Sequence, residues 1–104
     1  MRRASERIEA HAHQVMTLTG IADAAGLGVR GLQAAFLRHQ DTTPTAYARR
    51  VRMARAHRDL VDADPGGPEG VPTIAARWGF ADHGRFAAAY RGTYGRLPEE
   101  TLRR

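Results

Sequence analysis

Apolar residues return every three or four positions along most of this chain, which is the spacing of one face of an α-helix. The longest uninterrupted stretch is 43–61, in which Thr43 can cap the first turn and Pro44 suits the first helical position. We expect its buried face to carry Tyr47, Val51, Met53, Ala54, Ala56, Leu60 and Val61. The pattern therefore predicts one long helix near the middle of the chain.

Three shorter helices are predicted before this long helix, over 5–16, 18–25 and 29–39. The first has an apolar stripe of Ile8, Ala12 and Val15, and Thr17 offers an N-cap for the second. Gly26 ends the second helix, because a tight turn out of a helix often needs a positive φ angle.

The spacing within this first region is that of a helix-turn-helix. It places a small residue, Ala22, where two helices cross, Gly26 at the turn, and Leu32 under the following helix. We expect Leu27 to return to the core directly after the turn. The combination, rather than any one of these residues, indicates the motif.

The same pattern occurs again after the long helix. Ile21-Ala22-x-x-x-Gly26-Leu27 and Leu32-x-x-x-Phe36 have their counterparts in Ile74-Ala75-x-x-x-Gly79-Phe80 and Phe86-x-x-x-Tyr90. The repeat predicts helices over 73–78 and from Asp82 to Thr93, and Leu97-Pro98 begins a last short one. We therefore expect an all-α fold of about seven helices. Two helix-turn-helix subdomains, 1–42 and 62–104, would form a homeodomain-like pair joined by the linker helix 43–61.

The stretch 62–72 is rich in glycine, proline and acidic residues, which predicts an exposed connector. The acidic residues in and next to it would repel phosphate groups or, alternatively, contact a partner protein; they are Asp59, Asp62, Asp64 and Glu69.

Charge favours a polyanionic partner. Sixteen basic residues, all arginine, against eleven acidic ones give a net charge of +5, which indicates nucleic acid before an anionic membrane. The chain has no cysteine, which excludes thiolate catalysis and cysteine-ligated zinc. No apolar run approaches the roughly 20 residues of a membrane span, so we expect no membrane partner and a cytoplasmic, nucleoid-associated location.

The outward positions of the two predicted recognition helices are the candidate DNA-binding residues. In the first subdomain they are Val29, Arg30, Gln33, Ala34 and Arg38, and in the second His83, Gly84, Arg85, Ala87, Ala88 and Arg91. Arg30 suits guanine and Gln33 suits adenine in the major groove. We expect the first helix to read more sequence and the second to dock mainly on phosphate, with a thymine methyl contact through Ala87 or Ala88.

Residues 21–60 and 73–98 together resemble the DNA-binding domain of AraC/XylS-type bacterial transcription regulators. The most specific residues of the resemblance are Arg52-x-x-x-Ala56-x-x-x-Leu60, Ile74-Ala75-x-x-x-Gly79-Phe80, Phe86-x-x-x-Tyr90, Gly95 and Pro98. It implies seven helices and base-reading positions at Arg30, Gln33, Ala34, His83, Gly84 and Ala88. It also implies double-stranded DNA, RNA polymerase and an N-terminal effector or dimerisation domain as partners.

Several positions depart from the pattern of that family. Gly28, Gly84 and Leu97 stand where serine is common, Ala34 and Ala88 where arginine is common, and Asp41 where glycine is common. The residues that build the fold are kept, while several DNA-contact positions lack a hydrogen-bonding side chain.

The expected function is sequence-specific binding of double-stranded DNA by a transcription regulator. A linker helix about 27 Å long would let two recognition helices reach successive major grooves about 34 Å apart. The alternative is a protein-interaction module on the same fold with reduced base reading. We expect no catalytic residue, metal ligand or cofactor, because the histidines are scattered and neither paired carboxylates nor a nucleophile motif is present.

Overall fold

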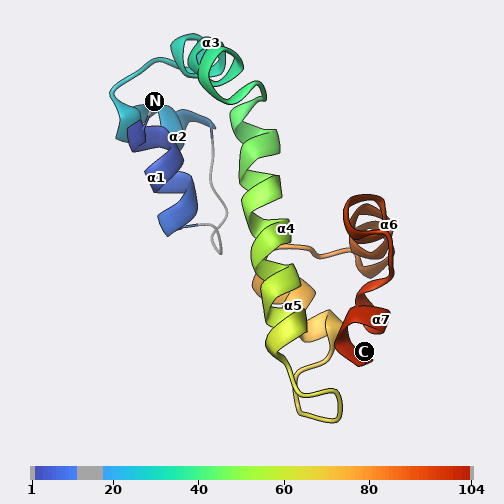
Figure 1. Cartoon of the computed structure of the whole chain (residues 1–104). Coiled ribbons are helices and arrows are strands. Elements are labelled where there is room, and N and C mark those ends of the chain that lie inside the picture. Colours follow the sequence, from blue (N-terminus) through green and yellow to red (C-terminus); the bar gives the residue numbers. More distant parts are fainter. Residues whose placement is uncertain (1, 12–17, 104) are drawn as a thin grey trace. The chain divides into compact units, whose positions relative to one another are not determined.

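The computed structural model describes residues 2–11 and 18–103, which form seven α-helices without any strand in that part of the chain (Figure 1). The helices are α1 (Arg2–Ala10), α2 (Leu18–Ala25), α3 (Val29–Gln40), α4 (Pro44–Asp62), α5 (Val71–Arg77), α6 (His83–Tyr94) and α7 (Pro98–Arg103). The predicted all-α class is confirmed.

Most helix boundaries follow the local signals in the sequence. The hydroxyl of Thr43 accepts a hydrogen bond from the backbone N–H of Ala46, as a capping residue should. Helix α5 begins two residues earlier than predicted, since Pro72 fits its first turn. Helix α1 begins at Arg2 rather than at residue 5. The predicted continuation of that helix from residue 12, with Ala12 and Val15, lies outside the described residues, as does Thr17, the predicted N-cap of α2.

The chain divides into two compact units, which we call unit 1 (Met1–Arg52) and unit 2 (Met53–Arg104). The division falls inside α4, so the first half of this helix belongs to one unit and the second half to the other. The predicted subdomain limits 1–42, 43–61 and 62–104 stay a prediction.

Unit 1 has its own core, built from α1, α2, α3 and the beginning of α4. Its buried residues are Ala4, Ile8, Ile21, Ala22, Leu32, Phe36 and Ala48. Ala22 is only 1% exposed, as expected for a small side chain at a helix crossing. A hydrogen bond from the Tyr47 hydroxyl to Glu9 also connects α4 to α1.

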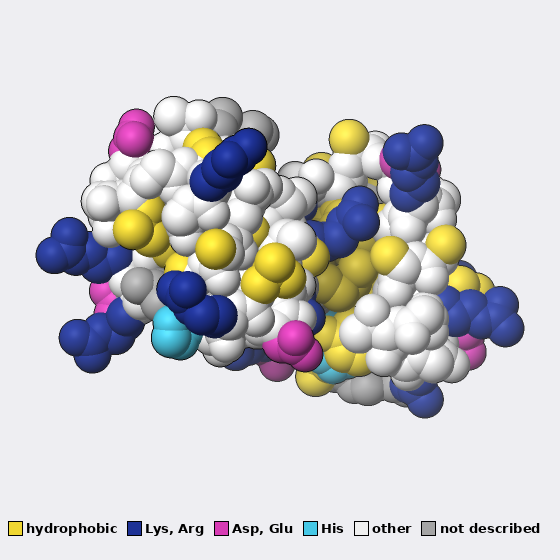
Figure 2. All heavy atoms as spheres, turned by 90° about the horizontal axis from the view of Figure 1, so that it is seen from above, with side chains coloured by type: hydrophobic (Ala, Val, Ile, Leu, Met, Phe, Trp, Pro, Cys, Tyr) yellow, Lys and Arg dark blue, Asp and Glu magenta, His cyan; other side chains and the backbone are white. Residues whose placement is uncertain are grey.

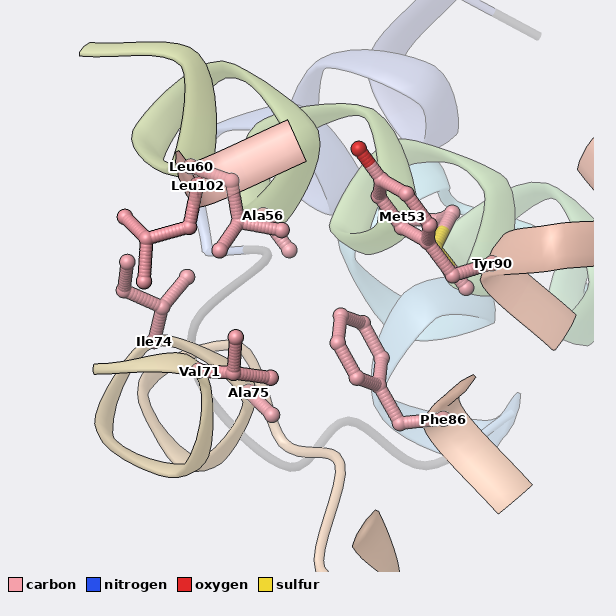
Figure 3. Packing of buried hydrophobic residues seen from close by; sticks show 9 residues of the cluster. All are labelled: Met53, Ala56, Leu60, Val71, Ile74, Ala75, Phe86, Tyr90 and Leu102. Atoms are coloured by element: carbon pink, nitrogen blue, oxygen red, sulfur yellow. The ribbon is translucent and has the colours of Figure 1, made fainter. Parts of the chain in front are cut away.

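Unit 2 has a second core, built from the end of α4 together with α5, α6 and α7. Figure 3 shows the ring of Phe86, on α6, pointing towards Val71 and Ala75 of α5, which belong to the same buried cluster. Tyr90 is fully buried; its hydroxyl donates to Oγ1 of Thr101 and lies 2.7 Å from Nδ1 of His57.

The two helix-turn-helix turns are built alike. In the first, the N–H groups of Gly26 and Leu27 donate to the carbonyls of Asp23 and Ala22. In the second, the N–H groups of Gly79 and Phe80 donate to Ala76 and Ala75 in the same pattern. Both glycines have positive φ angles, 73° and 83°, so the predicted role of glycine in each turn is confirmed.

The expectation that Leu27 returns to the core was wrong. Its side chain is 36% exposed and lies near the outer surface of α3, where a Cβ added at Gly31 would be 3.9 Å from its Cδ2. Val29 packs against the core of unit 1 instead. The counterpart in unit 2, Phe80, packs on its own core, with its ring centroid 4.9 Å from that of Phe86.

Two residues were wrongly assigned to the buried face of α4. Ala54 and Val61 are exposed, whereas Met53 and Leu60 are buried. Each exposed residue directly follows a buried one, and one position turns a side chain by about 100° around the helix. The buried face is therefore narrower than the hydrophobic pattern predicts.

Candidate nucleic-acid interface

Helix α3 presents a polar and cationic face to solvent. Leu32 and Phe36 are fully buried and hold the inner side of the helix in the core of unit 1. Arg30, Gln33, Ala34 and Arg38 are exposed, as predicted from the helical spacing. The core contacts therefore fix which side chains α3 can offer to a ligand.

Val29 differs from the other candidates on α3. It is half-buried and packs against the core of unit 1. It therefore helps to hold the start of the helix, and little of its side chain is left for a contact with DNA.

The beginning of α3 offers several hydrogen-bond donors. Neither Arg30 nor Gln33 has a hydrogen-bond or salt-bridge partner among residues 2–11 and 18–103. The N-cap residue Gly28 has an extended backbone (φ −77°, ψ 165°) and no side chain to cap the first-turn N–H groups. Such a helix terminus carries partial positive charge and favours an anion.

The beginning of α6 is already occupied by acidic groups. The side chain of Asp82 caps the helix by accepting a hydrogen bond from the N–H of Arg85, 2.9 Å away. Nε2 of His83 lies 3.1 Å from Oε1 of Glu99, at the start of α7. These two carboxylates reduce the attraction of this helix terminus for phosphate, and Glu99 competes with a base for His83.

The rest of the α6 face is poor in hydrogen-bonding groups. Gly84 and Ala88 are exposed and Ala87 is half-buried, so none of them offers a polar side chain. Arg85 and Arg91 are exposed, and neither side chain has a partner in the described part of the chain. The space-filling view also shows arginine side chains that project singly from the surface (Figure 2).

Two acidic residues near the connector have a structural role that the sequence pattern did not indicate. Arg77 forms salt bridges with Asp59 and Glu69, and Asp59 also accepts a hydrogen bond from the indole N–H of Trp78 at 2.7 Å. These carboxylates were expected to repel phosphate, but their charge is partly balanced within unit 2. Arg77 comes from α5, across the connector, and the expected repulsion of phosphate by this region stays a prediction.

Arg52, a residue singled out by the resemblance, is half-buried in α4. Burial, and secondly the positive charge of Arg49, lower its pKa from the ordinary arginine value. A partly buried side chain of this kind suits a structural role better than contact with phosphate.

No group of three or more potential metal ligands lies together in the part of the chain that the structure describes. His13, two residues after His11, lies outside that part. None of the described helices has the length and hydrophobicity to cross a membrane.

Comparisons with known proteins agree with this architecture. A family model described as a helix-turn-helix domain matches residues 21–104. The chain is 45% identical over 103 residues to the probable thc operon regulatory protein of Rhodococcus erythropolis, a match that covers 99% of this chain and 31% of that protein. It is 35% identical over 102 residues to XylDLEGF operon transcriptional activator 3 of Pseudomonas putida, covering 98% of this chain and 30% of the activator.

A solved structure is also similar over nearly its whole length. The crystal structure of a probable AraC family transcriptional regulator from Rhodopseudomonas palustris CGA009 superposes with a TM-score of 0.87 at 37% identity, covering 97% of this chain and 92% of that one. The chain spans about a third of the length of the two curated relatives. With the family model, the relatives and the solved structure in agreement, the chain belongs to the AraC/XylS family of transcription regulators as a helix-turn-helix DNA-binding domain, and it is not an enzyme.

Proposed function

We propose that this domain binds double-stranded DNA with α3 in a major groove, where Arg30 and Gln33 read base edges. The observation that carries the proposal is that both side chains are exposed and without a partner in the described part of the chain. Arginine can donate two hydrogen bonds to guanine O6 and N7, and glutamine can pair with adenine N6 and N7. The uncapped start of α3 supports a phosphate contact beside them.

The second recognition helix, α6, contributes mainly to docking in this proposal. Arg85 and Arg91 supply charge for phosphate contacts, which fix position without reading sequence. Ala88 offers only an apolar contact, and His83 faces competition from Glu99. We propose that α3 and α6 enter successive major grooves of one duplex, with α3 supplying most of the specificity.

The curated relatives are longer than this chain, which suggests partners besides DNA. Because it corresponds to about a third of each of them, we propose that its DNA binding is coupled to further protein contacts. The two partners that the family implies are RNA polymerase and an effector or dimerisation domain. With either partner, the proposed site residues on α3 and α6 contact the DNA.

The experiment is selection of bound duplexes from a random DNA pool by the wild type, Arg30→Ala and Gln33→Ala. Each substitution should abolish the preference at one or two base pairs, at about 1–3 kcal/mol per lost bidentate contact, and leave nonspecific binding nearly unchanged. Arg38→Ala is the matched control on the same helix. It should weaken all duplexes about equally, and an unchanged site preference in both Arg30→Ala and Gln33→Ala would contradict the assignment.

The protein-interaction alternative has one supporting observation, which is the lack of hydrogen-bonding side chains at Ala34, Gly84 and Ala88. Salt dependence separates the two functions. Binding through phosphates predicts that log affinity falls linearly with log salt, at nearly one unit of slope per contact. The protein-interaction function would be favoured if no duplex binds at low salt, or if the affinity for duplex does not change with salt concentration.

A further inference from the structure

Leu37 is the most exposed of the large hydrophobic residues in the described part of the chain. Its side chain is 58% exposed, whereas Leu27, Val61 and Leu97 are 36–37% exposed. It lies on α3, in the same helix as Arg30 and Gln33. A solvent-exposed leucine on a DNA-recognition helix gains nothing from the core, so its surroundings on the outer face decide what it can contact.

The helical position of Leu37 is central on that face. Seven residues correspond to nearly two turns, so Leu37 lies within about 20° of Arg30 around the axis and about 10 Å further along it. Counted from Arg30, the next outward residues lie three, four and seven positions further on, at Gln33, Ala34 and Leu37. Homeodomain recognition helices use the same spacing for the side chains that reach bases. Leu37 therefore occupies a base-facing position rather than the rim of the helix.

Its neighbours indicate a specific contact with a base. Within about one turn, the outer face carries Gln33, Ala34 and Arg38, so the apolar patch is small and bordered by polar and cationic groups. A protein partner would need a larger apolar surface than this. In the major groove, the 5-methyl group of thymine is the apolar feature of the base edges, and side chains without hydrogen-bonding groups recognise it.

We propose that Leu37 is a specificity-determining residue that contacts the 5-methyl group of a thymine in the major groove. This inference rests on the proposed insertion of α3 and extends it to a third reading residue. The thymine lies about three base pairs from the base that Arg30 reads, since successive pairs along a strand are about 3.4 Å apart. Ala34, on the same stripe, leaves room for the leucine side chain to approach the methyl group.

The test uses deoxyuridine, which pairs like thymidine but lacks the methyl group. In a duplex carrying the selected site, each thymine near the Arg30-dependent base is replaced in turn by uracil, and affinities are measured. For the wild type we expect one replacement to weaken binding about four-fold, the factor for removing one methyl-sized group from a buried contact. For Leu37→Ala, the thymine and uracil duplexes should bind within a factor of two of each other.

Two controls separate a loss of the thymine contact from a loss of folded protein. A comparison with Arg30→Ala separates it from a failure of the proposed DNA binding by α3. Val61→Ala removes an exposed apolar side chain from α4 and should keep the four-fold effect of uracil. Thermal melting of Leu37→Ala should match the wild type, since an exposed side chain is removed. If Leu37→Ala shows the wild-type response to uracil while Arg30→Ala loses its base preference, the inference about Leu37 is overturned and the proposed function stands. If the wild type binds no duplex, both are overturned.

Discussion

At the scale of single residues, the hydroxyl of Tyr90 is a buried polar group of unit 2 with two partners. It donates to Thr101 at 2.7 Å and lies at the same distance from Nδ1 of His57, inside an otherwise apolar core. The sequence predicts an inward Tyr90 from its spacing to Phe86. It could not predict these partners, because His57 and Thr101 belong to α4 and α7 and meet Tyr90 only after the helices pack.

Removal of this hydroxyl should destabilise the domain. Tyr90→Phe removes the hydrogen bonds that the Tyr90 hydroxyl makes with Thr101 and His57 in the core, so the free energy of unfolding should fall by about 1–3 kcal/mol in urea denaturation. Tyr47→Phe is the matched control, because the Tyr47–Glu9 hydrogen bond is exposed and water can replace it. A larger loss from Tyr47→Phe than from Tyr90→Phe would contradict this account of the buried hydroxyl.

The buried tyrosine also predicts a pH dependence. Burial raises the pKa of Tyr90 above its ordinary value, and burial together with Tyr90 raises the pKa of Tyr94. The unfolded chain releases these protons near pH ~10 while the folded state still holds them. Their contribution to stability is thus complete below pH ~10 and is lost as pH rises through the folded pKa. The urea concentration at the midpoint of unfolding should therefore fall as pH rises above about 10. It should fall less steeply in Tyr90→Phe.

At the scale of elements, the sequence predicts the helices well because each boundary has a local cause. Thr43 caps α4, Asp82 caps α6, and glycines end α2, α5 and α6 or follow them closely with positive φ. Contacts between elements were less predictable. Nothing local to Leu27 shows that it stays at the surface, and nothing local to His83 shows that Glu99 of α7 lies beside it.

Two glycines test these backbone roles: Gly92, inside α6, and Gly95, directly after it. Gly95 has φ 76° and open space around an added Cβ, so Gly95→Ala should cost about 1–2 kcal/mol through the left-handed backbone alone. Gly92 lies inside the helix with equally open space, so Gly92→Ala should stabilise by roughly 0.5–1 kcal/mol. Thermal melting measures both, and equal shifts in the same direction would show that φ is not what requires glycine at position 95.

At the scale of the whole molecule, two similar helices are expected to contribute unequally to DNA recognition. The repeat in the sequence predicts two recognition helices, and the residues at their outer faces predict that the first reads more bases. The structure adds the reasons: the start of α3 is uncapped by a side chain, while the start of α6 is bordered by Asp82 and Glu99. The operator sequence depends on which base edges meet these side chains, and no pattern within the chain encodes that.

The most direct measurement compares the affinity of the wild type for three duplexes at one salt concentration. They are the selected site, the site with the Arg30-dependent segment replaced by unrelated sequence, and the site with only the adjacent groove segment replaced. We predict that the first replacement lowers affinity to the nonspecific level, by at least ten-fold, because base contacts of about 1–3 kcal/mol each are lost. The second should lower it by less than about three-fold, since phosphate contacts survive a change of sequence. Equal losses, or a larger loss from the adjacent segment, would contradict the claim that α3 reads the sequence.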